Sequence, residues 1–224
     1  MPDYVINRLP HAAPPRDWND AVWETANLLR IDHFHERSST HRPLTTARLL
    51  YDDQNLYLHF RVRDQYVRCT HIGHQAEVFR DSCAEFFVRP KPGKGYFNFE
   101  TNCGGSMLLY FIEDHRRGFG GGFAKYEQVE PALVNNLQIV HSMPEKVDPE
   151  IQEPVEWHLQ LSIPFALFEH FVGPLEPSAQ RRWMGNFYKC ADDTSHPHWG
   201  TWSPIEKELN FHLPQYFGSL RFAE

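Results

Sequence analysis

Two neighbouring stretches of the chain alternate polar, chemically capable side chains with apolar ones. Successive side chains of a β-strand point to opposite faces, so each stretch should present two different surfaces. The apolar surface of residues 83–88 consists of Ala84, Phe86 and Val88. The other surface of the two stretches collects the polar side chains Glu85, Asn98, Glu100 and Asn102. Such a face is either solvated, as one face of many antiparallel sheets is, or used to bind a ligand.

A second polar stretch, residues 186–202, carries two large aromatic side chains, Trp199 and Trp202. An aromatic ring in a loop exposes apolar surface unless it packs or binds a ligand. One interpretation is that these indoles cover an edge of the core. The other is a stacking platform, because a pyranose ring has an apolar C–H face that suits an aromatic ring. Its hydroxyl rim suits carboxylates, amides and basic groups, and Phe79 could supply an opposing ring.

The elements that position these groups are predicted to be short strands. Residues 56–63 alternate most regularly, and an Asp-rich turn joins them to residues 44–51 as a hairpin. Nine or ten such strands, with one or two short helices such as residues 165–171, predict an all-β fold. We expect an antiparallel β-sandwich of the jelly-roll or immunoglobulin-like type. No domain boundary is evident, so residues 1–224 are interpreted as a single domain.

Composition excludes several classes of function. The net charge of −7 disfavours a nucleic-acid partner, because such proteins present a basic face. No apolar run is long enough to span a membrane. The N-terminus shows no signal peptide, which predicts a cytoplasmic protein unless a leader was omitted. The four cysteines, predicted to be mostly buried and reduced with a single bridge as the alternative, are Cys69, Cys83, Cys103 and Cys190.

Six segments along the chain together resemble the family-nine-like carbohydrate-binding proteins. They are ARLLYDDQNLY at 47–57, DSCAEFF at 81–87, YFNFETN at 96–102, GNFYKC at 185–190, HWGTWSPI at 198–205 and FHLPQYFG at 211–218. The resemblance extends from about Trp18 to the end of the chain. It implies a β-sandwich related to the DOMON-type domains that binds sugars without cleaving them.

The resemblance also implies roles for individual residues. In the better-understood modules of that family, two aromatic rings sandwich a terminal sugar and a glutamate holds its hydroxyls. By position, Glu85 matches this glutamate, and Trp199 or Trp202 matches one ring. Phe79 stands where the family has a tryptophan, which departs from the pattern. Those modules hold structural calcium, for which the oxygen donors here would be Asp52, Asp53, Asp81, Asp192 and Asp193.

The sequence therefore predicts non-catalytic binding of a mono- or oligosaccharide. Its candidate binding residues are Phe79, Arg80, Glu85, Asn98, Glu100, Asn102, Asn186, Lys189, Trp199 and Trp202. Oligomeric state is left open by the sequence.

Two other hypotheses remain open at this point. Glu85 and Glu100, on adjacent predicted strands, could act as the carboxylate pair of a glycoside-processing enzyme. A metal or haem protein is the second alternative. Zinc could use pairs of histidines two residues apart, which share a strand face: His33 with His35 and His196 with His198. The resemblance to the DOMON group also implies a haem alternative, because some of its domains bind haem through a histidine and a methionine, and the methionines here would be Met107, Met143 and Met184.

Overall fold

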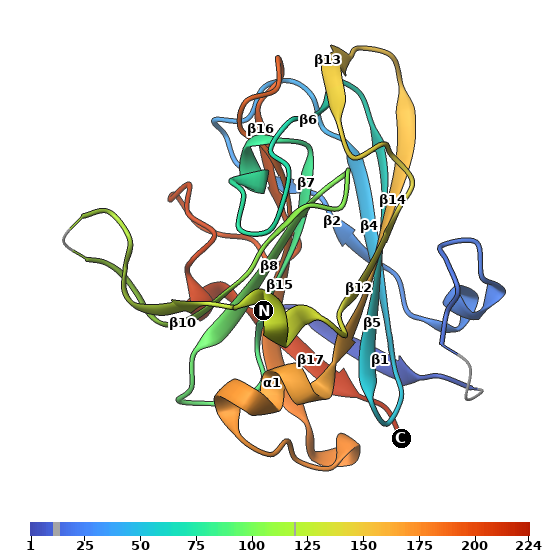
Figure 1. The fold of residues 1–224 in the computed structure, drawn as a ribbon, viewed down its shortest axis with the longest axis vertical. Coiled ribbons are helices and arrows are strands. Elements are labelled where there is room, and N and C mark those ends of the chain that lie inside the picture. The colour runs from blue at the N-terminus through green and yellow to red at the C-terminus, as the bar shows by residue number, and fades with distance from the viewer. Residues whose placement is uncertain (11–13, 119) are drawn as a thin grey trace.

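The computed structural model describes residues 1–10, 14–118 and 120–224, which form a two-layered β-sandwich (Figure 1). The first sheet contains, in spatial order, β11 (Phe123–Gln128), β10 (Tyr110–Arg117), β8 (Tyr96–Asn102), β7 (Cys83–Arg89), β15 (Arg182–Ala191), β17 (Gly218–Phe222) and β1 (Asp3–Arg8). The second contains β1, β4 (Leu44–Tyr51), β5 (Asn55–Asp64), β14 (Val155–Pro164) and β12 (Gln138–His141). Strand β1 links the layers because its first half pairs with β17 and its end pairs with β4. The predicted all-β sandwich is confirmed.

Shorter elements complete the two sheets. Strand β9 (Met107–Leu108) pairs with β8, and β16 (His198–Thr201) pairs with β15. Strand β3 (His33–Phe34) pairs with β16, and β2 (Leu29–Ile31) pairs with β4. A separate pair joins β6 (Val67–Cys69) to β13 (Val147–Ile151). The helices are α1 (Phe165–Val172) and the 3₁₀ turns η1 (Ala21–Thr25), η2 (Val78–Arg80), η3 (Pro131–Val134), η4 (Ser178–Gln180) and η5 (Pro214–Tyr216). None of the helices in the described ranges has the length and apolar character required to cross a bilayer.

The core lies between the two layers and follows the predicted alternation. The inward side chains of β5, Leu56, Leu58, Phe60 and Val62, are fully buried. Ala84, Phe86 and Val88 of β7 belong to the same cluster, as the sequence predicted. All four cysteines are buried, as predicted, and none of them forms a disulfide.

The outer face of the first sheet differs from a solvated face. Every residue of β8, polar ones included, is buried. On β7, Glu85 is only 2% exposed. The hairpin of β10 and β11 and the segment before β17 lie beside this face and screen it from water (Figure 1). Buried polar groups need hydrogen-bond partners, so the polar side chains on this covered face are candidates for binding a ligand.

Candidate functional site

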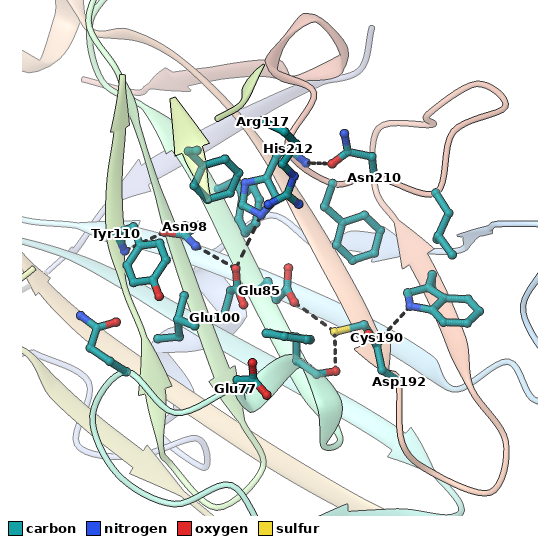
Figure 2. Close-up of a pocket in the computed structure, with 18 of the residues that line it drawn as sticks. Glu77, Glu85, Asn98, Glu100, Tyr110, Arg117, Cys190, Asp192, Asn210 and His212 are labelled. Carbon is teal, nitrogen blue, oxygen red and sulfur yellow. Dashed lines mark hydrogen bonds and ion pairs between the residues drawn. The ribbon is translucent and has the colours of Figure 1, made fainter. Parts of the chain in front are cut away.

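A hollow of about 700 Å³ opens on the outer face of the first sheet (Figure 2). Its floor comes from β7, β8 and β15, and its walls come from η2, β16, the β10–β11 hairpin and residues 209–212. The side chains that line it are Arg37, Gln75, Glu77, Phe79, Glu85, Phe87, Asn98, Glu100, Leu108, Tyr110, Arg117, Phe123, Cys190, Asp192, Trp199, Leu209, Asn210, Phe211 and His212. We call this hollow the β7–β8 pocket.

The floor of the β7–β8 pocket is acidic. Glu85 and Glu100 are direct partners in the antiparallel pairing of β7 with β8, so both carboxylates project into the hollow (Figure 2). Asn98 donates from Nδ2 to Glu100 Oε1 at 2.8 Å and accepts from the Tyr110 amide at 2.7 Å. Glu85 Oε1 accepts from the Cys190 thiol at 3.0 Å. Its Oε2 is buried without a hydrogen-bond partner and is therefore free to accept one from a ligand.

Aromatic rings form one wall of the pocket. The indole of Trp199 donates from Nε1 to Asp192 Oδ1 at 2.7 Å, which fixes the orientation of the ring. The Asp192 amide in turn donates to the carbonyl of Phe79 at 3.2 Å. This contact ties η2 to the end of β15, and thereby holds Phe79 and Trp199 in one apolar cluster at the pocket.

The segment before β17 forms the opposite wall. Tyr188 donates its hydroxyl to the Phe211 carbonyl at 3.0 Å, and the two rings stack with centroids 4.1 Å apart. His212 Nδ1 lies 2.9 Å from the Tyr96 hydroxyl, and its ring packs against Phe123. Its Nε2 lies 4.0 Å from Glu100 Oε1. The segment is thus pinned to the sheet by hydrogen bonds at two successive residues.

Burial sets the protonation of the pocket. Burial raises the pKa of Glu100 to about 8, and the hydrogen bond from Asn98, which lowers this pKa, offsets the effect of burial only in part. Burial also raises the pKa of Glu85 well above its usual range, and the nearby Cys190 and Glu100 add to this effect. Burial lowers the pKa of His212 to about 3. At neutral pH the carboxyl pair therefore retains a proton and the imidazole is neutral, so the floor can both donate and accept.

The raised pKa of Glu100 predicts a measurable pH dependence of stability. The unfolded chain releases this proton near 4.5, whereas the folded protein keeps it up to about 8. The free energy of unfolding should therefore fall as pH rises through that window, by up to about 1.4 kcal/mol per unit. A Glu100→Gln variant should lose most of this dependence and be the more stable protein at about pH 8.

Urea unfolding of both proteins at about pH 5 and about pH 8 measures this difference. Glu206→Gln, at an exposed position, is the matched control and should follow the parent profile. A Glu100→Gln variant destabilised equally at both pH values would contradict the assignment.

Half of the predicted sugar-binding residues line the β7–β8 pocket: Phe79, Glu85, Asn98, Glu100 and Trp199. The other half lie outside it. Arg80 pairs with Glu77 and Asp193 at the surface. Asn102 donates to the His71 carbonyl and to Asp81 beyond the end of the pocket.

Three of the outside residues are committed to the interior. Asn186 exchanges hydrogen bonds with the backbone of Ser203. Lys189 is fully buried beside Asp64 on the core side of β15. Trp202 is 9% exposed and packs edge-on against Tyr4 and Phe187, so it covers the core and does not line the pocket.

The five aspartates proposed as calcium donors fall into two groups, with Asp52 and Asp53 in the β4–β5 turn and Asp81, Asp192 and Asp193 around η2. Asp52 accepts from Gln54, Asn55 and Tyr57 within the β4–β5 turn. Asp53 pairs with Arg8. The remaining three have nitrogen donors: Asp81 from Thr70 and His71, Asp192 from Trp199, and Asp193 from Arg80. Calcium binding stays a prediction.

Neither histidine pair forms a metal centre within the described residues. His198 is buried with its Nε2 2.9 Å from Lys189 Nζ, while His196 stacks on Tyr66. His33 is exposed beside Asp32. Across the part of the chain that the structure describes, one group of three such side chains reaches metal-ligand spacing, and it consists of Cys83, Glu85 and Cys190.

Several pocket residues were not predicted from the sequence. They are Arg37, Gln75, Glu77, Phe87, Leu108, Tyr110, Arg117, Phe123, Leu209, Asn210, Phe211 and His212, together with Cys190, for which only burial was predicted, and Asp192, which was assigned to calcium. Strand alternation could have indicated Phe87, because it lies on the same strand face as Glu85, two residues away. The residues at 209–212 had no such signal, because their position depends on how the segment folds back over the sheet.

The sequence model of carbohydrate-binding family 9 matches residues 19–222. The chain belongs to carbohydrate-binding family 9. No protein of curated function matches it significantly.

Solved structures of similar fold include other carbohydrate-binding proteins. A Bacteroides uniformis protein, provisionally described as carbohydrate-binding, is 25% identical over 99% of both chains, with a TM-score of 0.85. A family 9 module from Caldicellulosiruptor kristjanssonii in complex with cellotriose is 10% identical and has a TM-score of 0.61, over 99% of this chain and 93% of that one. The glucose complex of a family 9 module from the same organism gives the same identity and TM-score, over 99% and 96%. At 10% identity these two share the fold. Membership of the family supports sugar binding without cleavage over the glycoside-processing and haem alternatives.

Proposed function

We propose that the β7–β8 pocket is the sugar-binding site of this protein and that it holds the sugar without cleaving it. The observation that carries the proposal is an aromatic wall beside a floor of buried hydrogen-bonding groups. Phe79 and Trp199 offer apolar rings to the C–H face of a pyranose. Glu85, Asn98 and Glu100 lie where hydroxyls of the same ring would point.

The unpartnered oxygen of Glu85 supports this assignment. A buried acceptor without a partner costs about 1–3 kcal/mol. A sugar hydroxyl that donates to Glu85 Oε2 would remove that cost, so binding gains from a group already placed and desolvated. A ligand that lacks a hydroxyl at this position would leave the oxygen unsatisfied, which gives the site its discrimination.

The family 9 modules of similar fold bind glucose and cellotriose. We therefore propose glucose and short cello-oligosaccharides as the first ligands of this pocket. Its volume of about 700 Å³ lies within the usual range for small-molecule sites. Because few polar groups engage the ligand, we expect modest affinity.

Isothermal titration calorimetry with glucose, cellobiose, cellotriose and a panel of non-glucose sugars tests the proposal. We expect saturable heat with at least one of them and a marked loss of affinity in Glu85→Gln, whose side chain has one oxygen acceptor where glutamate has two. Chromatography of the same mixtures after long incubation should show no new saccharide. Absence of binding across the panel would overturn the function, and undiminished binding by Glu85→Gln would overturn the site.

A further inference from the structure

The floor of the β7–β8 pocket contains a second cluster whose chemistry differs from that of sugar recognition. Cys83 and Cys190 are direct partners in the pairing of β7 with β15, so their thiols lie on the same outer face. Glu85 follows two residues after Cys83 on that face. One ligand atom from each of the three side chains lies within 4.8 Å of the other two. Within it, Cys190 Sγ lies 3.0 Å from Glu85 Oε1 (Figure 2).

We propose that Cys83, Glu85 and Cys190 bind a thiophilic divalent cation, Zn²⁺ being the expected occupant. Tetrahedral zinc has bonds of about 2.3 Å to sulfur and about 2.0–2.2 Å to oxygen, which places its ligand atoms about 3.5–3.8 Å apart. In the cluster one pair of ligand atoms is 3.0 Å apart and none is more than 4.8 Å apart. Small side-chain rotations would therefore bring the three atoms to the separations that zinc requires. The backbone that carries the three residues is already fixed by two strand pairings.

The ligand types in the cluster suit a thiophilic cation. Two thiols and a carboxylate are buried together, at 2% exposure or less. The basic neighbour in β15, Lys189, points to the core side and is paired with Asp64. Glu85 Oε2 has no partner, so no hydrogen bond at that oxygen resists a turn of the carboxylate onto a metal. Two thiolates select zinc or cadmium over calcium, which prefers oxygen ligands alone.

The β7–β8 pocket offers the metal a route in and out. Glu85 and Cys190 both line it, whereas Cys83 lies behind them. Three protein ligands with one open position is the arrangement of zinc sites that accept an exogenous ligand. The fourth position would face the hollow, where water or a sugar hydroxyl can reach it. The inference rests on the cluster itself and does not depend on sugar binding.

The chain supplies its own control in a second pair of thiols. Cys69 and Cys103 are buried in contact with each other, and the Cys69 thiol donates to the carbonyl of Glu145 at 3.1 Å. No carboxylate or imidazole completes a ligand group around this pair within the described residues. Both pairs therefore consist of buried cysteines that lie next to each other, but among the described residues only Cys83 and Cys190 have a third ligand.

Cadmium titration of the reduced, metal-free full chain tests the site. Binding of Cd²⁺ to thiolates produces an ultraviolet charge-transfer band, and Zn²⁺ affinity follows from competition with a chromophoric chelator. We expect one Cd²⁺ per chain in the parent and in the double variant Cys69→Ser with Cys103→Ser. Cys83→Ser should weaken binding by more than about tenfold, because even outer-shell changes cost that much.

Circular dichroism confirms that each variant is folded. The proposal fails if the parent shows no thiolate band, or if the band survives in Cys83→Ser and disappears in the Cys69/Cys103 variant. Sugar calorimetry on Cys83→Ser separates this inference from the proposed function, since that residue does not line the pocket. Retained sugar affinity with lost metal affinity is the expected pattern.

Discussion

Substitution of Lys189 by methionine should lower the free energy of unfolding by about 3–5 kcal/mol, the usual cost of leaving one partner of a buried ion pair alone. Lys189 is fully buried, and its Nζ lies 3.4 Å from Asp64 Oδ2. The same ammonium donates to the Cys190 carbonyl at 3.0 Å and lies 2.9 Å from His198 Nε2. Methionine fills similar space but leaves the Asp64 carboxylate without its counter-charge.

The cost of this substitution should shrink in acid. Burial acts to raise the pKa of Asp64, but Lys189 and hydrogen bonds from His41 and Trp157 outweigh it, so the pKa lies below its usual range. A carboxyl with a lowered pKa contributes stability above its unfolded value of 3.8, and this contribution is lost as pH falls. In the variant Asp64 protonates more readily, so the difference from the parent decreases at low pH.

Chemical denaturation measures the free energy of unfolding of the parent, of Lys189→Met and of the double variant that also carries Asp64→Asn. The neutral amide should restore part of the stability, because no unpaired charge remains. Lys125→Met removes an exposed lysine that pairs with Glu113 at 2.8 Å, and should cost less than about 1 kcal/mol. Equal losses for Lys189→Met with aspartate or asparagine at position 64 would rule out the ion pair as the cause.

Lys189 also shows the limit of what strand alternation predicts. The strict alternation of β7 and β8 correctly placed Glu85, Asn98 and Glu100 on one face, because strand periodicity is a local property of the chain. In β15 the same rule separates Asn186 from Lys189, which are three residues apart and so face opposite sides. Composition favoured both as surface groups, and only the packing of Trp157 and Asp64 reveals that Lys189 belongs to the core.

Strand alternation also bears on Trp199 and Trp202. Trp199 and Trp202 are three residues apart around β16, and an extended chain cannot present both to one surface. Periodicity could therefore have shown that only one lines the pocket, but not which one. That choice depends on the close approach of Trp202 to Gly218, where an added Cβ would lie 2.5 Å from the indole. This contact joins residues distant in the sequence.

The covering of the pocket depends on nonlocal pairing throughout. The direct pairing of Cys83 with Cys190 requires the register of β7 on β15, which one sequence does not encode in any local pattern. Likewise, Phe211 and His212 reach the pocket through contacts with Tyr188 and Tyr96. The carboxylates of the floor and the aromatic wall of Phe79 and Trp199 were therefore predictable, whereas the opposite wall and the pairing of the thiols required the structure.

Replacement of Trp199 by alanine should weaken sugar binding more than any other single aromatic change. Burial of a large apolar side chain against a ligand contributes about 1.5–3 kcal/mol, which corresponds to roughly a 10–150-fold change in Kd. The hydrogen bond to Asp192 holds the indole before the ligand arrives, so little ordering is required on binding. Trp199→Phe should retain part of the affinity, since a smaller ring still offers a face.

Calorimetry with the tightest-binding sugar of the panel measures this loss, and thermal unfolding shows whether each variant is folded. Trp18→Ala is the matched control, because Trp18 stacks on His158 beside a hollow on the outer face of the second sheet, and its removal should leave sugar affinity unchanged. Equal losses in Trp199→Ala and Trp18→Ala would contradict the site, as would full affinity in Trp199→Ala. A loss confined to Trp199 would place the sugar against this indole and thus directly above the Glu85 and Glu100 floor.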